Sequence, residues 1–600
     1  MGSPGEGVLA RVGQPGIRGA GAGAGGRRLP PAGPPCADGY KLFAKGGFPL
    51  RELSRRDFLL GVTGTGLVVV LGACAPTQQP AQPSQPAGGL AQEQVIRIPL
   101  TEPPTLDPGL ATDTVSLDVI SQLFEGLVGF DDSGKVFGIH AERWEASSDG
   151  LTYTFYLRQG PKWSNGRPVT AQDYEWAWKR NIDPKTASDY ATTLFPIKNA
   201  QAIHEGKADP QTLGVRARDD RTLEVILEAP AAYFLRLAST WTMFPLPREA
   251  IEKYGDKWTE AGNIVTNGPF KMSSWKHQQE IVLERNEDYW GKKPTLRRAV
   301  YRIFPEGAEE QVLAAYENDE LDVARGIPPA QVDRVLNDPK LKQQVKVFDQ
   351  SGTMFIVINN RRPHLKDPRV RQALGMTLER QTIIDKVLKT VASPAYSLQP
   401  PGIMGRNPDI WPKEDVNRAK QLMADAGYPN GQGFPEITFT YNTSAAWKAL
   451  GEYLQQRWQQ TLGIKVKLQE MEWAVFLKWR RSPEATQTFD VYRGGWLSDY
   501  EDPNNWYNVL WDSAEDPGIF NSGWKNEEYD RIVRRARAEL NEQRRQELYS
   551  QAEKILAQEY PNIPVYHYAT RHLVKPWVSN WTVSRILGFA PLRDVQILAR

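Results

Sequence analysis

An apolar run of sixteen residues, 58–73, divides this chain into a leader and a part long enough to fold. Arg55 and Arg56 precede the run, and Leu71-Gly72-Ala73-Cys74 closes it with small residues. A helix that spans a bilayer needs about twenty residues, and glycines inside the run weaken any helix. A charged start, a short apolar stretch and a small-residue end are typical of a secretory signal. We therefore expect an export signal over 53–73, rather than a membrane span or a buried core helix.

The two ends of this signal resemble known processing motifs. Ser54-Arg55-Arg56-Asp57-Phe58-Leu59 is similar to the twin-arginine export motif, although paired arginines also occur in ordinary signals. Leu71-Gly72-Ala73-Cys74 resembles a bacterial lipobox, which implies lipidation of Cys74 after cleavage. Acyl chains there would hold the protein at a membrane, each buried methylene contributing about 0.8 kcal/mol. The export route, twin-arginine or general secretory, stays open.

The segments on either side of the signal lack the apolar bulk for a core. Residues 1–52 are rich in Gly, Pro, Ala and Arg. We interpret this low-complexity extension as the result of a start codon assigned too far upstream. Residues 74–94 are rich in Pro, Gln, Ala and Gly with almost no charge, so they predict a flexible tether.

Composition excludes several functions for the 527 residues from Cys74 onward, which are enough for more than one domain. The whole chain has a net charge of +2, and residues 1–73 carry +5, so the net charge of the part from Cys74 onward is about −3. We therefore expect no nucleic-acid partner. Cys36 and Cys74 both lie outside the foldable part, so no disulfide or thiolate metal site is expected there. His567 and His572 are the closest pair of scattered histidines, and we expect neither a metal site nor a cofactor.

Short strands and amphipathic helices alternate from about Val95. Strands are predicted over 95–100, 151–158, 221–230 and 562–568, and helices over 114–127, 367–388 and 544–560. In 151–158 the alternation of Tyr153, Phe155 and Leu157 with polar neighbours predicts a half-buried strand. The order of elements predicts a mixed α/β fold rather than one doubly wound parallel sheet.

Seven segments between residues 141 and 503 carry recognisable motifs: AERWEASSDGLTYTFYLRQGPKWSNGRPVTAQDYEWAWKR (141–180), DPKTASDYA (183–191), GNIVTNGPF (262–270), VLERNEDYW (282–290), FIVINN (355–360), YNTS (441–444) and GGWLSDYEDP (494–503). In this order they resemble the family 5 extracellular solute-binding proteins of ABC transporters, and within that family the oligopeptide-binding proteins. The resemblance spans about 95–600. It implies a three-lobed, periplasmic-binding-protein-like (Venus flytrap) α/β fold with mixed sheets, in which two large lobes joined by a hinge close on the ligand. Domain I is expected from 95–124, 249–351 and 567–600, the smaller domain II from 125–248 and domain III from 352–566.

The resemblance also implies a ligand site. Asp499 stands where peptide binders of the family place the carboxylate that pairs with a free α-amino group. A buried ammonium needs such an opposite charge. On the local sequence alone, a turn aspartate is the simpler interpretation. Tyr190 matches a residue whose hydroxyl helps to hold the same amino group.

Two segments match the main-chain binding elements of the family, one on each lobe. Strand addition of this kind reads main-chain groups, so affinity does not depend on the ligand's side chains. The first segment is Arg493, Gly494, Gly495, Trp496 and Leu497, and the second is Thr112, Asp113 and Thr114. Trp473 and Trp496 are candidate pocket walls, although each suits a core equally well.

Basic residues are candidates for the ligand's carboxylate. Arg493 matches such a position in the family. Arg480 or Arg481 and Lys386 or Lys389 lie near others, where solvated surface residues are at least as good an interpretation.

The chain departs from a well-known peptide binder of the family at three positions. Trp447 replaces a histidine that contributes to carboxylate recognition, and Gly352 and Leu497 replace a disulfide pair. The loss of the histidine leaves the peptide length open. A tryptophan in the cleft also suits stacking on a sugar ring.

We therefore expect a non-enzymatic, monomeric receptor, exported and anchored through Cys74 at the outer face of the membrane or in the periplasm. Its partners are an oligopeptide and the transmembrane subunits of an ABC permease. The alternatives are an oligosaccharide or other small solute in the same fold, and a secreted hydrolase that uses Asp499 with Glu501 or Asp502 as a carboxylate pair.

Overall fold

The structure, a computed structural model, describes residues 89–131, 135–515, 519–586 and 588–600. The predicted extension, the signal, Cys74 and most of the tether lie outside these ranges. Residues 89–94, the end of the predicted tether, are hydrogen bonded to the C-terminal segment: the Ala91 amide donates to Ile597 and the Ala599 amide donates to Gly89. Within the described ranges, no helix combines the length and apolarity that a membrane span requires.

The first sheet joins the start of the described chain to a segment about two hundred residues later. β1 (Val95–Leu100) pairs in parallel with β10 (Arg298–Ile303), followed by β9 (Glu280–Arg285) and β8 (Phe270–Lys276) in antiparallel order. The predicted strand over 95–100 is confirmed. The helix predicted over 114–127 is α1 (Thr114–Leu123), and it ends at Phe124, whose backbone is extended.

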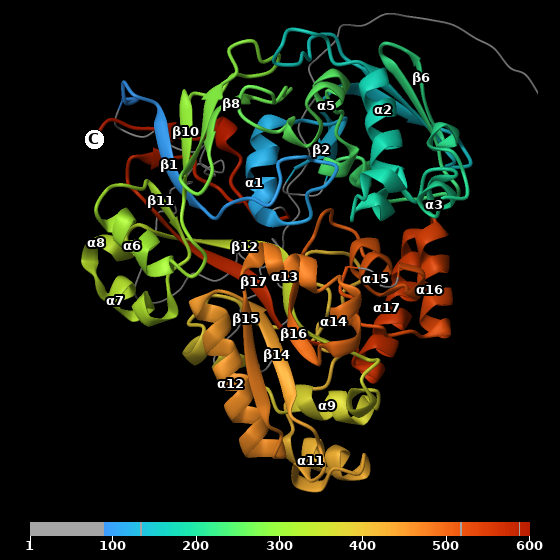
Figure 1. Ribbon diagram of the computed structural model, residues 1–600, viewed down its shortest axis with the longest axis vertical. Coiled ribbons are helices and arrows are strands. Elements are labelled where there is room, and N and C mark those ends of the chain that lie inside the picture. Colours follow the sequence, from blue (N-terminus) through green and yellow to red (C-terminus); the bar gives the residue numbers. More distant parts are fainter. Residues whose placement is uncertain (1–88, 132–134, 516–518, 587) are drawn as a thin grey trace, which may run out of the picture. The chain divides into compact units, whose positions relative to one another are not determined.

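A second sheet is formed entirely by the residues between α1 and β8 (Figure 1). Its order is β4 (Ala141–Ala146), β5 (Thr152–Leu157), β7 (Thr222–Ile226) and β6 (Val215–Asp219). Burial alternates along β5 as the sequence predicts, with Tyr153, Phe155 and Leu157 inside. The other elements here are β2 (Val128–Phe130), β3 (Val136–Gly138), α2 (Ala171–Ile182), α3 (Ala200–His204), α4 (Phe234–Leu237) and α5 (Arg248–Tyr254).

The third and largest sheet carries most of the remaining chain. Its order is β11 (Val323–Arg325), β17 (Asn562–Val574), β12 (Val345–Ile358), β16 (Val491–Leu497), β14 (Ile437–Asn442) and β15 (Val466–Met471), with β13 (Ser393–Pro394) on β17. The helices on this part of the chain are α6 (Glu309–Glu317), α7 (Val332–Asn337), α8 (Pro339–Lys342), α9 (Pro368–Met376), α11 (Val416–Asp425), α12 (Ala445–Leu462), α13 (Trp473–Trp479), α14 (Pro483–Thr488), α15 (Asn504–Trp511), α16 (Glu527–Ala538) and α17 (Glu542–Glu559). A short β18–β19 pair (Val578–Ser579 and Gln596–Ile597) lies near the C-terminus.

The two long strands β12 and β17 run without interruption across the positions where the sequence predicts domain I to meet domain III (Figure 1). Their pairing register shifts between Asp349 and Thr353 and again between Met354 and Phe355. Such irregularities bend and twist a sheet locally. The domain limits stay predictions, but a bent pair of strands is a suitable hinge.

The prediction of one continuous helix over 367–388 is wrong. The segment forms α9, a break, then α10 (Arg380–Thr382) and a π-helical turn over Ile383–Val387. Glu379 leaves the helical region at φ −81° and ψ 85°. The buried Arg380 donates to the Pro564 carbonyl at 2.9 Å and pairs with Glu414. These contacts with distant residues hold Arg380 in a position that a continuous helix would not allow. The hydrophobic periodicity of the segment does not reveal them, because it depends on local sequence alone.

Candidate functional site

Two adjoining cavities lie between the large sheet and the elements that face it. We name them the Asp499 chamber, of about 220 Å³, and the Glu306 chamber, of about 520 Å³. They share Thr114, Trp473 and Arg493 as lining residues. The predicted site residues that line the Asp499 chamber are Thr112, Asp113, Thr114, Tyr190, Trp473, Arg493, Gly495, Trp496, Leu497 and Asp499.

Two predicted residues lie elsewhere. Gly494 faces away from the chamber, because a Cβ built on it would meet Val357 and Phe355 of β12. Trp447 lines the Glu306 chamber, where its ring stacks on the Arg493 guanidinium at 4.3 Å from the ring centroid. The sequence therefore identifies residues that the fold brings together from both sides of the cavities.

Asp499 is a buried carboxylate without a cation beside it in the described part of the chain. It follows the end of β16 and is only 7% exposed. Asn505, near the start of α15, donates to Asp499 Oδ2 at 3.0 Å and accepts from the Asp499 amide at 3.0 Å. Burial raises the pKa of Asp499 to about 7, although the bond from Asn505 lowers it. A buried carboxylate with a raised pKa is favourably placed to receive a cation.

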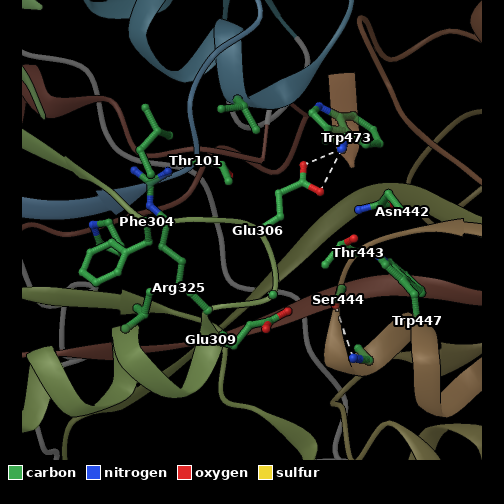
Figure 2. Close-up of a pocket in the computed structure, with 18 of the residues that line it drawn as sticks. Thr101, Phe304, Glu306, Glu309, Arg325, Asn442, Thr443, Ser444, Trp447 and Trp473 are labelled. Atoms are coloured by element: carbon green, nitrogen blue, oxygen red, sulfur yellow. Dashed lines mark hydrogen bonds between the residues drawn. The ribbon is translucent and has the colours of Figure 1, made fainter. Parts of the chain in front are cut away.

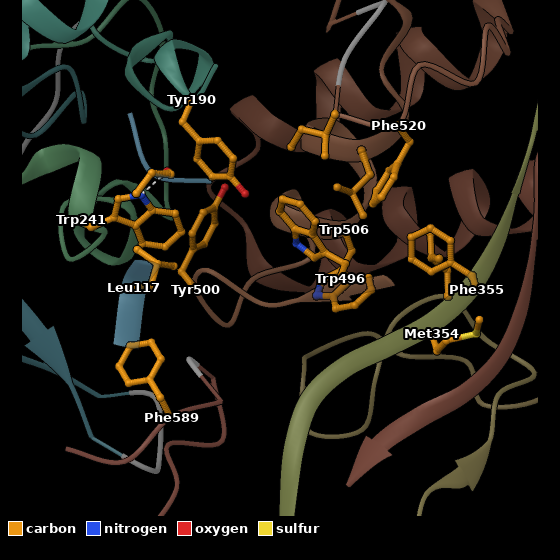
Figure 3. Packing of buried hydrophobic residues seen from close by; sticks show 14 of the residues in the cluster. Leu117, Tyr190, Trp241, Met354, Phe355, Trp496, Tyr500, Trp506, Phe520 and Phe589 are labelled. Carbon is orange, nitrogen blue, oxygen red and sulfur yellow. Dashed lines mark hydrogen bonds between the residues drawn. The ribbon is translucent and has the colours of Figure 1, made fainter. Parts of the chain in front are cut away.

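Aromatic rings form the wall beside this carboxylate. Tyr190 stacks on Trp496 with ring centroids 6.3 Å apart and contacts Trp241 at 5.4 Å (Figure 3). The Trp241 indole donates to the Ala111 carbonyl at 2.9 Å, which fixes this ring. Burial and the nearby Asp499 charge both raise the pKa of the Tyr190 hydroxyl, so it stays protonated and able to donate.

One edge of β16 is available along the chamber. The strand pairs with β12 over its whole length, from Val491 to Leu497, but with β14 only through Val491 and Tyr492. Within the described residues, the segment 493–497 therefore has a strand on one side only. Main-chain groups on an unpaired edge can accept an added strand.

The opposite wall is the start of α1. Asp113 is the N-cap of this helix, where its side chain accepts from the amides of Val115 and Ser116 at 3.0 Å each and from Ser116 Oγ at 2.8 Å. Its carboxylate is thus used within the fold, whereas the sequence predicted Asp113 only as part of a ligand-binding segment. The main chain of 112–114 is positioned by this cap.

The arginines that the sequence singled out have different surroundings. Arg480 lines the Asp499 chamber, is buried, and has no carboxylate partner among the described residues; burial lowers its pKa to about 10. Arg481 instead forms an ion pair with Asp189. Lys389 pairs with Asp333, and Lys386 is exposed, so neither lysine lines the chambers.

Gly352 and Leu497 lie opposite each other in the β12–β16 register. A Cβ on Gly352 would approach Leu497 Cδ2 to 2.5 Å and the Trp496 carbonyl oxygen to 2.7 Å. The leucine side chain therefore fills the space that a second side chain would need.

The structure does not support the carboxylate pair of the hydrolase alternative. Asp502 is fully buried in an ion pair with Arg545, and Glu501 pairs with Arg585. Neither carboxylate lines the chamber of Asp499. In the described ranges there is also no group of three or more His, Cys, Asp or Glu side chains that could hold a metal ion.

Three lining or supporting residues escaped the sequence analysis: Asn505, Trp241 and Glu306. Asn505 follows Asp499 by six positions, and this spacing alone gives no reason to link them. Trp241 and Glu306 lie in segments remote in sequence from β16, and only the fold brings them to the cavities.

Comparison with known proteins decides the family. A family model described as bacterial extracellular solute-binding proteins, family 5 Middle, matches residues 135–518. The chain is a family 5 bacterial extracellular solute-binding protein. This solute-binding protein is 36% identical over 523 residues to the periplasmic oligopeptide-binding protein OppA of Escherichia coli K12, a match that covers 86% of this chain and 94% of OppA.

Solved structures confirm the expected fold class. The Escherichia coli murein tripeptide binding protein MppA matches this solute-binding protein with a TM-score of 0.77 at 32% identity, covering 85% of this chain and all of MppA. Against the unliganded open form of MppA, at 32% identity and with 86% and 99% of the two chains covered, the TM-score is 0.62. The described arrangement of this family member is therefore less similar to that open form than to the first MppA structure.

Proposed function

We propose that this protein is the receptor of an ABC importer and that it captures oligopeptides by their free N-terminus and main chain. The single observation that carries the proposal is Asp499, a buried and unpaired carboxylate in a chamber that is bordered by an unpaired strand edge. The relatives named for oligopeptides and for a murein tripeptide support it.

The chemistry of Asp499 suits an α-ammonium group. A carboxylate taken out of water is costly unless a charge of opposite sign and hydrogen bonds compensate for the lost hydration. Asn505 supplies one bond, and a peptide ammonium would supply the charge and further donors. The Tyr190 hydroxyl can complete the recognition from the aromatic wall beside the carboxylate.

The free edge of β16 suits the peptide main chain. A ligand strand along 493–497 would exchange hydrogen bonds without reading side-chain identity, and the segment 112–114 would contact it from the other lobe. Because both lobes contribute, ligand binding favours closure about the bent strands β12 and β17.

The remaining expectations belong to the same proposal. The protein is exported, is anchored through a lipidated Cys74, acts without catalysis as a monomer and delivers its ligand to the permease. The periplasmic relatives support export, and the lipobox-like sequence supports the anchor. The three-domain division with limits at 124/125, 248/249, 351/352 and 566/567 is part of the proposal.

Calorimetric titration of purified, ligand-stripped protein tests the central claim. Tetraalanine is expected to bind, N-acetylated tetraalanine to bind at least tenfold more weakly, and Asp499→Asn to remove the difference between the two peptides. Asp256→Asn, which changes an exposed aspartate in the turn Gly255–Lys257, away from both chambers, is the matched control and is expected to bind as wild type does. Equal affinity of wild type for the free and the acetylated peptide would refute amine recognition by Asp499.

A further inference from the structure

The Glu306 chamber continues the path of a peptide that starts at Asp499. Arg493 lines both chambers and lies at the far end of the unpaired β16 edge. The segment 493–497 covers four residue intervals, and a strand rises about 3.4 Å per residue, so the edge is about 14 Å long. A ligand strand on this edge reaches the Glu306 chamber at about its third or fourth residue.

The walls of this chamber come from two distant parts of the chain. Glu306 lies in the loop after β10, and Glu309 is the first residue of α6. Across the cavity are Asn442, at the end of β14, and Trp447, in α12 (Figure 2). The chamber thus has carboxylates on one side and an amide and an indole on the other.

Two buried oxygen atoms of this chamber lack a donor among the described residues. Glu309 Oε2 and Asn442 Oδ1 are both buried and have no hydrogen-bond partner in the described part of the chain. Glu306 accepts only from a main-chain amide, that of Trp473, at 2.8 Å to each oxygen. Neither glutamate has a cation within ion-pair distance among the described residues. Unmet acceptors in a cavity indicate a ligand that brings donors.

The charges around Glu306 favour a cationic donor. Burial raises the pKa of Glu306 to about 7, and the nearby carboxylates of Glu472, Glu309 and Glu470 raise it further. Of the two arginines that line the chamber, Arg325 is paired with Asp118 through Nη1, while its Nε and Nη2 have no hydrogen-bond partner among the described residues, and Arg493 lies at the boundary with the other chamber. Neither arginine forms an ion pair with Glu306 or Glu309 in this part of the chain. A cation beside Glu306 and Glu309 would relieve the repulsion between them.

We propose that the Glu306 chamber gives this receptor a preference for peptides with a lysine or arginine side chain at the third or fourth residue. Glu306 and Glu309 bind the cationic group, Asn442 Oδ1 accepts a further hydrogen bond, and Trp447 covers the aliphatic part of the side chain. The preference rests on the proposed peptide function, and it concerns side-chain specificity rather than amine recognition.

Calorimetric titration with matched tetrapeptides tests the preference. The peptides are tetraalanine and its variants with lysine, with norleucine, the uncharged analogue, or with glutamate at position three or four. The titrations are made at about pH 8, above the pKa of about 7 of Glu306, so that this group is ionised. The proteins are wild type, Glu306→Gln, Glu309→Gln, the double variant and Glu310→Gln. Glu310 is the neighbouring residue of α6 and is exposed, so it controls for loss of one negative charge.

For wild type, we expect the lysine peptide to bind at least tenfold more tightly than the norleucine peptide at one of the two positions, and the glutamate peptide to bind worst. The double variant is expected to reduce the lysine preference to about twofold while it keeps the affinity for tetraalanine, because glutamine retains the bond from the Trp473 amide. Glu310→Gln is expected to keep the full preference.

Two results overturn the inference and leave the proposed function intact. One is equal binding of the lysine and norleucine peptides by wild type, and the other is an unchanged lysine preference in the double variant. If neither tetraalanine nor any variant peptide binds to wild type, both the inference and the proposed function fail.

Discussion

Replacing Asp499 by asparagine is expected to stabilise the ligand-free protein at alkaline pH while it removes amine recognition. The carboxylate is buried, and its partner among the described side chains is Asn505, which carries no charge. Without ligand, ionisation of Asp499 therefore leaves a negative charge in the interior that has no ion-pair partner among the described residues. Asparagine has nearly the same shape and keeps an oxygen for the bond from Asn505, but it cannot ionise.

The size of the effect follows from the pKa of Asp499, which burial raises from 3.8 to about 7. One pKa unit corresponds to about 1.36 kcal/mol, so the fully ionised group lowers the free energy of unfolding by about 4 kcal/mol. Because the folded-state pKa is above the unfolded value, the stability that this group confers is complete below pH 3.8 and is lost as the pH rises through about 7. Between about pH 5 and pH 8, the free energy of unfolding of wild type should therefore fall by about 2 to 3 kcal/mol relative to that of the variant.

Thermal unfolding followed by tryptophan fluorescence measures the difference. An unfolding entropy of about 2.1 cal/mol/K per residue gives about 1 kcal/mol/K for about 500 residues. The difference between the unfolding midpoints of wild type and Asp499→Asn should therefore change by about 2 to 3 °C from pH 5 to pH 8. Bound ligand must be removed first by unfolding and refolding. Asp256→Asn is the control and should follow wild type. If wild type and Asp499→Asn lose stability in parallel from pH 5 to pH 8, the reasoning about a buried unpaired charge is wrong.

Three further changes test the supports of the site. Arg545→Met removes the closer of the two arginines that pair with the buried Asp502 carboxylate and leaves the longer contact with Arg236 at 3.5 Å, so it should lower the free energy of unfolding by about 3 kcal/mol, measured by thermal unfolding; a normal midpoint would contradict the importance of the Arg545 pair. Gly352→Ala places a Cβ about 2.5 Å from the Leu497 side chain and should cost about 1 to 3 kcal/mol in the same assay, with partial recovery when Leu497→Ala is added. Asn505→Ala removes the amide that orients the buried carboxylate at the end of β16, so the affinity for tetraalanine should fall about tenfold by calorimetry; full affinity would show that the amide is dispensable.

The sequence predicted correctly those features that depend on local patterns or on long ordered motifs. The alternation in 151–158 identified β5 and its buried face, because a strand that lies on a core exposes alternate residues. The motifs between 141 and 503 identified the family, which the comparisons confirm. They also directed attention to Asp499, Tyr190 and the segment 493–497, which line or border one chamber in the fold.

Features that depend on contacts between distant segments were not predicted. The helix breaks near Glu379 because Arg380 binds to Pro564 and Glu414. The hydrophobic pattern of residues 367–388 does not indicate those partners, which lie elsewhere in the sequence. The sequence predicted Asp113 as a ligand-binding residue, but in the fold its carboxylate caps α1.

The sequence by itself determined the class of this protein: a mixed α/β solute-binding protein with a carboxylate near the end of a Gly-rich strand. Only the tertiary structure decided which charges remain unpaired. Asp502 and Asp499 are three residues apart and chemically identical, but Arg545 neutralises the first, whereas the second faces a chamber and has no ion-pair partner among the described residues. Electrostatic interaction falls with distance in space and is strengthened by burial, and neither quantity can be read from sequence separation.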